Sequence, residues 1–452
     1  MRVNSDAAAV TLAIIGCGQR GNAYATYAKV FPSACKIVAI AEPRSEARAA
    51  FAQNYGVDRS LVFKDWREFL DASRDTVKTI GRRLADAVVV CVQDSIHVEV
   101  AVAFAEQGYH VLCEKPMATS IEDCVRMEKA VKNAKIIFGM GHVLRYSSFN
   151  QEITKVIRSG ELGELVNVVH IEPVGHWHFA HSYVRGNWSR EAQSSFSLMT
   201  KSCHDIDLIC HWLSPATPTR ISSFGSLKHF KKAAKPVEAG NATRCLACPI
   251  RKTCPYSAER IYLDEIKKGR KTWPVDVLVD GVPDIENVTH ALNTGPYGRC
   301  AYESNNDVCD NQVVNIEFSN SSTASFTMIA QTSLICERQT RLHSSHGELV
   351  ADASTNTITL ADFRTRQQRV LTPPPPSKGE VAYNKHGRGG HGGGDFGLVR
   401  AFVEAVSTGQ QEVLGTDVGE VLRSHLAVFA AEKSRKEGVV VQCEEFFGDF
   451  TC

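Results

Sequence analysis

The stretch IIGCGQRG, residues 14–21, places three glycines between an apolar run and an amphipathic run. Gly16 permits a tight turn, Gly18 lets the backbone approach a pyrophosphate, and Gly21 lets helix and strand pack closely. The helix that follows offers amide donors and a partial positive charge to phosphate groups. The order strand, glycine turn, helix therefore predicts a dinucleotide-binding unit near the start of the chain.

The first part of the chain, residues 10–140, alternates short β-branched runs with longer amphipathic stretches. This alternation is typical of a parallel sheet with helices on both faces. The expected strands are VTLAIIG, KIVAIAEP, DAVVVCV, HVLCEKP and KIIFGMG. The expected helices lie near residues 20–31, 45–55, 96–107 and 120–133.

The pattern changes after about residue 143, where long strands with few intervening helices predict a large, mostly antiparallel sheet. The fold class is therefore α/β, with a dinucleotide-binding domain at 1–142 and a second α/β domain at 143–452. We expect a Cys-rich insertion at about 228–311 and a flexible glycine loop at 386–395. The remaining expected elements are a helix at 149–158, a final helix at about 395–407, and strands at 219–225, 312–318, 323–331, 347–351 and 357–361.

An acidic residue, Glu42, ends the second expected strand 21 residues after Gly21. A carboxylate there accepts hydrogen bonds from the adenosine ribose and repels a 2′-phosphate. The cofactor is therefore predicted to be NAD, with NADP the less favoured cofactor, and Arg44 works against this preference. Glu114, Lys115 and Pro116 close a later strand at its carboxyl end, where open α/β sheets bind ligands.

The near-equal numbers of basic and acidic residues argue against partners that bind through a large surface of one charge. There are 51 basic and 50 acidic residues, a net charge of +1, so neither nucleic acid nor an anionic membrane surface is expected to bind. No apolar run approaches the ~20 residues that cross a bilayer. We therefore expect a cytoplasmic protein with a small-molecule partner.

The glycine turn, the tripeptide EKP, VQDSIHVEVAVAFAEQGYHVL (92–112) and HDIDLICHWL (204–213) together resemble the glucose–fructose oxidoreductase/inositol dehydrogenase family. The resemblance implies a Rossmann domain plus an α/β domain whose open sheet carries the substrate pocket and often the oligomer interface, in a dimer or tetramer. It also implies hydride transfer between a nicotinamide cofactor and a secondary hydroxyl of a sugar, cyclitol or sugar acid.

The resemblance assigns roles residue by residue. Lys115 matches the lysine that hydrogen-bonds the reacting hydroxyl, His97 lies near the cofactor, and His204 matches the acid/base histidine. An imidazole can take the hydroxyl proton because its pKa lies near working pH. Thr200 stands where many relatives carry an aspartate, so Lys201 could bind an acidic substrate group, assist the base, or pair with Asp205. Further substrate candidates are Arg145, Tyr146, His176 in GHWHFAH, and His391 with Asp395 in the glycine loop.

Two other functions fit the same resemblance. One is a glycosidase-like reaction in which bound NAD oxidises the sugar transiently, promotes elimination and is regenerated. The other is a non-enzymatic NAD-sensing regulator, which the presence of both Lys115 and His204 disfavours.

Cysteines cluster in GNATRCLACPIRKTCPYSAERIY, residues 240–262. Reduced thiols at this spacing predict a structural zinc site, with Cys245, Cys248, Cys254 and Cys300 as ligands and Cys309 as the second choice for the fourth. An iron–sulfur cluster is the alternative ligand of these cysteines, and the third possibility is that the thiols bind no metal. The segment carries few apolar residues, so a metal would supply its stability.

Overall fold

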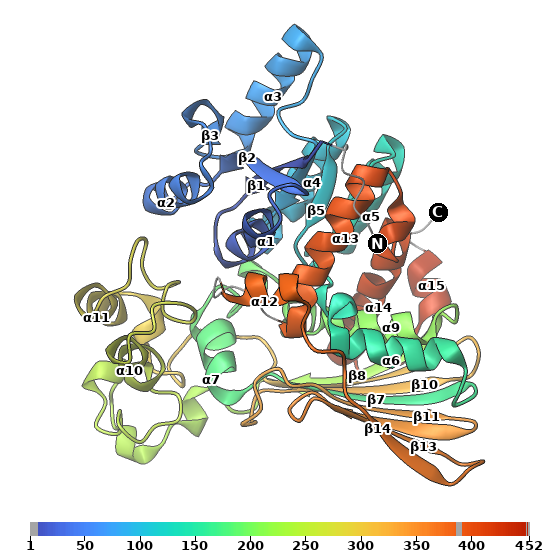
Figure 1. Ribbon diagram of the computed structural model, residues 1–452. Coiled ribbons are helices and arrows are strands. Elements are labelled where there is room, and N and C mark those ends of the chain that lie inside the picture. The colour runs from blue at the N-terminus through green and yellow to red at the C-terminus, as the bar shows by residue number, and fades with distance from the viewer. Residues whose placement is uncertain (1–7, 386–390, 449, 451–452) are drawn as a thin grey trace. The chain divides into compact units, whose positions relative to one another are not determined.

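The computed structural model describes residues 8–385, 391–448 and 450, and its contacts divide the chain into two compact units (Figure 1). Of the described residues, unit 1 comprises 8–151, 374–385 and 391–425, and unit 2 comprises 152–373, 426–448 and 450. The predicted domains, 1–142 and 143–452, stay a prediction, and a C-terminal segment of the chain belongs to unit 1.

Unit 1 is built on a six-stranded sheet in the order β3-β2-β1-β4-β5-β6, and every pairing in it is parallel. The strands are fully apolar where they pass through the centre, since helices cover both faces. The predicted doubly wound sheet is confirmed. Its strands are β1 (Val10–Ile15), β2 (Cys35–Ala41), β3 (Val62–Phe63), β4 (Ala87–Val90), β5 (His110–Cys113) and β6 (Phe138–Met140).

The helices of the N-terminal segment follow the predicted positions closely. One more, α3, was not predicted, although Asp65 caps it by accepting hydrogen bonds from the amides of Arg67 and Glu68. The bounds are α1 (Gln19–Val30), α2 (Ser45–Tyr55), α3 (Trp66–Ile80), α4 (His97–Glu106) and α5 (Ile121–Ala134).

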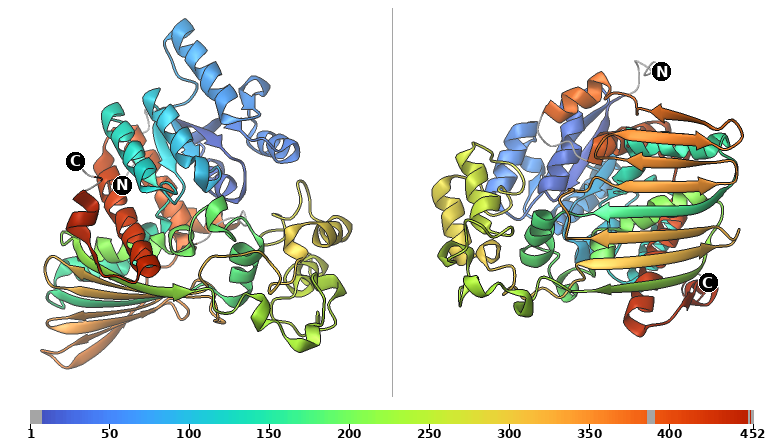
Figure 2. Two further views of the ribbon diagram at one scale, coloured as in Figure 1. Left: turned by 180° about the vertical axis from the view of Figure 1, so that it is seen from behind. Right: turned by 90° about the horizontal axis from the view of Figure 1, so that it is seen from below.

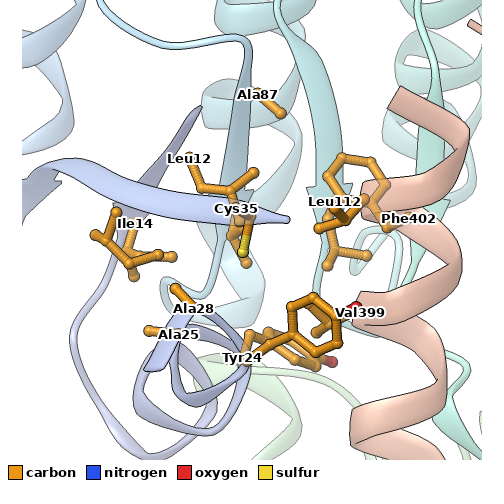
Figure 3. Packing of buried hydrophobic residues seen from close by; sticks show 14 of the residues in the cluster. Leu12, Ile14, Tyr24, Ala25, Ala28, Cys35, Ala87, Leu112, Val399 and Phe402 are labelled. Atoms are coloured by element: carbon orange, nitrogen blue, oxygen red, sulfur yellow. The ribbon is translucent and has the colours of Figure 1, made fainter. Parts of the chain in front are cut away.

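The C-terminal segment of unit 1 joins the core of the parallel sheet. Phe402 and Val399 of α13 (Gly394–Thr408) pack in one buried cluster with Leu112 of β5 and Tyr24 of α1, as Figure 3 shows. The short helix α12 (Lys378–Lys385) adds Tyr383 to the same cluster. The prediction that the helix near 395–407 is the last one is wrong, because α14 (Val418–Glu437) and α15 (Cys443–Gly448) follow it.

Unit 2 is built on a nine-stranded sheet in the order β14-β13-β12-β11-β7-β10-β9-β8-β15. Its pairings are antiparallel except between β7 and β10, so the predicted mostly antiparallel sheet is confirmed. Strands β11, β14 and β15 were not predicted. The bounds are β7 (Leu165–Pro173), β8 (Pro218–Ser226), β9 (Asn311–Phe318), β10 (Thr323–Ile329), β11 (Gln339–Ser344), β12 (Gly347–Asp352), β13 (Thr357–Asp362), β14 (Gln367–Leu371) and β15 (Val441–Gln442).

One face of this sheet is covered and the other is open. Helices α6 (Ser148–Ser159), α9 (Cys203–Leu213) and the C-terminal part of α14 lie behind the sheet in Figure 2 (right), where no described helix covers the face turned to the viewer. On the open face the register pairs Phe224 with Val313, and their exposed fractions are 71% and 36%. Among the described helices of both units, none is long and apolar enough to span a bilayer.

The insertion carries short turns and helices, α10 (Asp264–Lys267) and α11 (Ile285–Thr294) among them. It has a small apolar core of its own, in which Tyr262, Val275 and Leu292 are fully buried. The expectation that this segment has too few apolar residues to order by burial is therefore wrong. Helices α7 (His176–Phe179) and α8 (Ser197–Thr200) complete unit 2.

Candidate functional site

The glycine turn between β1 and α1 is shaped by close backbone approach. Gly16 has a φ of +96°, and a Cβ there would lie 2.4 Å from the carbonyl oxygen of Cys91. A Cβ at Gly21 would lie 2.0 Å from the carbonyl oxygen of Gly16, so helix and strand could not keep their spacing. Around Gly18, by contrast, the nearest atom is a guanidinium nitrogen of Arg44 at 3.6 Å, which leaves room for a phosphate group to approach the turn. The turn therefore fits a dinucleotide.

Glu42, directly after β2, is held against this turn. Its carboxylate accepts hydrogen bonds from the amide of Cys17 at 2.8 Å and from Nε of Arg44 at 2.8 Å. Burial alone would raise the pKa of Glu42, but hydrogen bonds and charge from Arg44 outweigh it and lower the pKa. Glu42 is 3% exposed, so it is a buried anion at the position where the sequence predicts a ribose contact.

A second buried carboxylate, Glu114, links the glycine turn to the end of β5. It accepts hydrogen bonds from Nε of Arg20 and from the hydroxyl of Tyr24, both at 2.5 Å. The amide of Lys115 donates to its other oxygen at 3.0 Å. Burial opposes ionisation, but the charges of Arg20 and Lys115 lower the pKa of Glu114. The EKP tripeptide and the glycine turn are therefore parts of one network.

The same arginine binds the C-terminal segment of unit 1. Nη2 of Arg20 donates to Asp395 at 2.6 Å, and Nδ1 of His391 lies 3.2 Å from the same carboxylate. Asp395 is 1% exposed and stands in the first turn of α13. His391 and Asp395 thus lie with the nucleotide half of the molecule. Residues 386–390 of the predicted flexible loop lie outside the described residues.

Two histidines hold the loop that carries Lys115. His97 is buried, with Nδ1 2.7 Å from the carbonyl oxygen of Pro116 and Nε2 3.1 Å from that of Val92. On the other side, Nε2 of His425 accepts a hydrogen bond from the amide of Met117 at 2.9 Å. His97 and His425 therefore fix the backbone on either side of the turn after Lys115.

Arg145 and Tyr146, predicted to contact substrate, have polar contacts within unit 1. Arg145 forms an ion pair with Glu420 at 2.9 Å, and the Tyr146 hydroxyl donates to the carbonyl oxygen of Leu414 at 2.8 Å. Both contacts join the segment after β6 to the C-terminal segment. A role for either residue toward substrate stays a prediction.

In unit 2, Lys201 forms an ion pair with a carboxylate that was not predicted from the sequence as a site residue. Its Nζ lies 3.3 Å from the carboxylate of Glu172, near the C-terminal end of β7, and 2.9 Å from Sγ of Cys336. Burial opposes the charge, but Cys336 and Glu172 raise the pKa of Lys201. The ion pair of Lys201 is therefore with Glu172 and not with Asp205. A role for Lys201 toward an acidic substrate group or the general base stays a prediction.

Asp205 is bound by other groups. It lies 3.0 Å from Nε of Arg338 and accepts a hydrogen bond from Nε2 of His170 at 3.0 Å. Burial would raise its pKa, but the charge of Arg338 and the hydrogen bond from His170 lower the pKa of Asp205 to about 2. Arg338 also contacts Glu172 at 2.5 Å, so two buried carboxylates share two buried cations.

His204 stands beside this network in the first turn of α9 and is 5% exposed. The segment GHWHFAH surrounds a tryptophan of the insertion: the rings of Trp177, His178 and His181 lie 5.2, 5.0 and 5.4 Å from the ring of Trp273. Burial lowers the pKa of His181 to about 3, so that ring is neutral. His176 is half-buried against the carbonyl of Thr332, at 3.2 Å.

The predicted zinc site is not supported. Among the described residues, no group of three or more His, Cys, Asp or Glu side chains is close enough to hold a metal ion. A structural zinc ion is bound tetrahedrally by four ligands, with each sulfur about 2.3 Å from the ion. Cys245, Cys248, Cys254 and Cys300 nevertheless line one cavity, whereas Cys309 does not line it.

Residues 10–142 match the sequence model of the oxidoreductase family with an NAD-binding Rossmann fold. This region is similar to that family, and the match covers less than half of the chain. The predicted resemblance and the NAD-binding character of the Rossmann domain are confirmed.

Curated relatives of the family match part of the chain. A 2,7-anhydro-N-acetylneuraminate hydratase of Escherichia coli is 33% identical over 152 residues, which is 33% of this chain and 39% of the relative. A myo-inositol 2-dehydrogenase of Thermotoga maritima is 26% identical over 153 residues, 34% of this chain and 42% of the relative. The matched region spans less than half the length of these curated relatives.

Solved structures extend the likeness to the whole fold. Levoglucosan dehydrogenase, solved with NADH and levoglucosan, aligns with a TM-score of 0.67 at 17% identity, covering 96% of this chain and 99% of that one. An aldose–aldose oxidoreductase of Caulobacter crescentus aligns with a TM-score of 0.64 at 16% identity, covering 96% of this chain and 99% of that one. At this identity the likeness shows the fold alone, and both units share it.

Proposed function

We propose that the chain is an NAD-dependent oxidoreductase that transfers a hydride to or from a secondary hydroxyl of a sugar, cyclitol or sugar acid. The observation that carries the proposal is the Arg20–Glu114 contact, which joins the glycine turn to the strand end bearing Lys115. A nucleotide held by the turn would then meet the lysine from within a single unit. The cofactor, when bound, supplies the hydride acceptor or donor.

The residues of this chain supply the rest of the chemistry. Lys115 hydrogen-bonds the reacting hydroxyl, and Glu114 keeps the lysine turn in register through the Lys115 amide. His204 takes or returns the hydroxyl proton, which an imidazole can do near neutral pH. Lys201, held protonated by Glu172, positions the neighbouring groups and does not serve as the base.

The experiment is a steady-state assay of NADH formation over a panel of polyols. Lys115→Ala should abolish turnover while NAD binding, held by the glycine turn, is retained. His204→Ala should lower turnover ~10²–10⁴-fold, as expected for loss of a general acid/base. Lys36→Ala is the matched control, since Lys36 is exposed on β2 of the same unit. Near-normal turnover in Lys115→Ala would remove this lysine from the mechanism.

NAD is the proposed cofactor, and Glu42 supports it. Its buried carboxylate is ionised and would repel a 2′-phosphate. Arg44 lies beside it and is half-exposed, so the comparison of catalytic efficiency with NAD and NADP is decisive. Equal or better use of NADP would mean that Arg44 serves the ribose side instead of Glu42.

A second candidate is the redox-neutral reaction, in which NAD oxidises the sugar transiently, elimination follows and NAD is regenerated. One of the relatives is a hydratase, and this supports the redox-neutral reaction as a second candidate. Release of a leaving group without net NADH would establish it in the same assay. The regulator alternative predicts NAD binding with neither product.

The chain is further proposed to work in the cytoplasm as a homo-oligomer, a dimer or tetramer. Every described cysteine is a free thiol, as a reducing compartment allows. The open face of the nine-stranded sheet, with Phe224 paired to Val313, supports association of copies through that face. Sedimentation of the protein and of Phe224→Asp tests this, and an unchanged mass would place the interface elsewhere.

A further inference from the structure

An exposed tryptophan of the insertion, Trp273, is not used by the proposed hydride transfer. It lies in the loop between α10 and α11, and it is 39% exposed, more than any other tryptophan of the described chain. A single exposed apolar side chain is common on protein surfaces, so exposure alone assigns it no role. Its surroundings distinguish Trp273 from such a residue.

Three rings from the segment after β7 hold Trp273 in place. The ring of Trp177 lies 5.2 Å from it, and those of His178 and His181 meet it edge-on at 5.0 and 5.4 Å. These are separations of favourable aromatic pairs. Trp177 also packs against the apolar core of the insertion. The exposed ring is therefore ordered without a ligand, which lowers the entropic cost of binding one.

The two histidine rings beside Trp273 are uncharged near neutral pH. Burial, followed by the charge of Lys201, lowers the pKa of His178 well below its usual range. Burial, followed by the charge of Arg185, lowers the pKa of His181 to about 3. Neither ring therefore competes as a cation for the negative face of the tryptophan. The C–H bonds of a sugar ring carry a weak positive charge at their hydrogens, so they pack well on such a face.

His178 also joins Trp273 to the polar network of unit 2. Its Nδ1 lies 3.4 Å from Sγ of Cys336, and that sulfur accepts a hydrogen bond from Nζ of Lys201 at 2.9 Å. Lys201 stands just before α9, whose first turn carries His204. One continuous set of contacts within unit 2 thus runs from the segment of the proposed acid/base histidine to the exposed tryptophan. Because two side chains stand between Lys201 and Trp273, a ligand that reaches both extends beyond one sugar ring.

We propose that Trp273 is the stacking platform of a second sugar subsite, so that the substrate is a disaccharide rather than a free monosaccharide. The inference rests on the proposed function, since it takes His204 as the group that meets the reacting hydroxyl. The reacting ring lies beside His204 and Lys201, and the ring joined to it packs on Trp273. The insertion thereby determines which sugars are accepted, while hydride transfer uses the same groups as before.

The test is calorimetric titration of the full chain, with and without NAD, using each monosaccharide and a disaccharide that contains it. The probes are glucose with maltose and with cellobiose, and galactose with lactose. At least one disaccharide should bind ~2–10-fold more tightly than its monosaccharide, the range of one aromatic contact. Equal or weaker binding of every disaccharide would overturn the second subsite. A disaccharide preference without any NADH formation would support the subsite and count against the proposed function alone.

Variants assign the preference to the ring. Trp273→Ala should remove most of the disaccharide preference, and Trp273→Phe, which keeps an aromatic face, should retain most of it. Val282→Ala is the matched control, because Val282 is a 71% exposed apolar residue of the same insertion, and it should leave both dissociation constants unchanged. A preference that persists in folded Trp273→Ala would overturn the role of the ring.

A measurement on the unaltered chain covers the case in which Trp273→Ala does not fold. Acrylamide quenches exposed tryptophans first, and Trp273 is the most exposed one. The disaccharide should therefore reduce the quenching of tryptophan fluorescence, and its monosaccharide should reduce it less. Equal quenching with both sugars would place the second ring away from Trp273 and overturn the proposal.

Discussion

Each unit of this molecule contains a network in which two buried carboxylates share basic side chains, but the two networks differ in how far water reaches them. In unit 2, Glu172 and Asp205 are fully buried and their partners Lys201 and Arg338 have side chains only 12% and 9% exposed. In unit 1, Glu114 and Asp395 are just as buried, yet their shared partner Arg20 is 30% exposed.

The difference separates a structural network from one placed at a binding surface. Both cations of unit 2 lie within the protein, so the network is closed and its main effect is on stability. Arg20 lies between Gly18 and Gly21 of the glycine turn, and its side chain is 30% exposed. Charges that solvent can reach are screened and contribute less to folding, which leaves them free to serve a ligand.

Asp205→Asn should give the largest effect on stability. The substitution keeps the shape but removes one of the two carboxylates that neutralise the buried Arg338, and breaking a buried pair costs about 3–5 kcal/mol. Urea unfolding followed by tryptophan fluorescence measures it, because Trp177, Trp188, Trp212 and Trp273 all lie in unit 2.

Asp362→Asn is the matched control for that substitution. Asp362 forms an exposed ion pair with Arg364 in the same unit, and its loss should lower the free energy of unfolding far less than the loss of Asp205, because solvent screens an exposed pair. Equal losses for Asp205→Asn and Asp362→Asn would show that the buried network contributes no more than a surface pair.

The pH dependence of unit 2 should show the same network with a smaller effect. Folding lowers the pKa of Asp205 from 3.8 to about 2, so its stabilisation is complete above 3.8 and is lost as the pH falls toward the folded value. The loss amounts to about 2 kcal/mol at 1.36 kcal/mol per unit. Urea midpoints between pH about 5 and about 3 should fall more steeply for the unaltered chain than for Asp205→Asn. If the urea midpoints of the two proteins fell equally with pH, the assignment of this pH dependence to Asp205 would be contradicted.

Local patterns were enough to predict most elements up to residue 142, with β3 and α3 missed. The predicted strands are continuous apolar runs, and Gly16, Gly21 and Glu42 stand at fixed spacings that one turn explains. Arg20 was overlooked, although an arginine inside the glycine turn is an unusual neighbour for a phosphate site and could have been noticed. Nothing local shows that α13 returns to pack on Leu112, since that contact depends on residues almost 300 positions apart.

The polar network of unit 2 was harder to predict from local sequence patterns. Glu172 and His170 alternate with half-buried residues on β7, so a charged group at a buried strand position could have been identified from the sequence. Arg338 stands just before β11, a strand whose composition is too polar to be predicted. The register of β11 against β7, which pairs Gln339 with Ile171, places Arg338 beside Glu172, and its contact with Asp205 requires in addition that α9 packs on the sheet. Long-range pairing, not residue type, therefore determines which carboxylate each cation meets.

Asp395→Asn is the counterpart substitution in unit 1 and should have the smallest effect on folding. Asp395 is as buried as Asp205, but its partners Arg20 and His391 are about one-third exposed, whereas Arg338 is 9% exposed. The stability cost should therefore be about 1 kcal/mol, well below that of Asp205→Asn. Amide exchange of α13 measures it within unit 1. The dissociation constant for NAD should rise several-fold, because Arg20 loses one of the two contacts that fix it beside the glycine turn. A stability loss as large as that of Asp205→Asn, with NAD affinity unchanged, would make the unit 1 network structural as well and remove the distinction between the two.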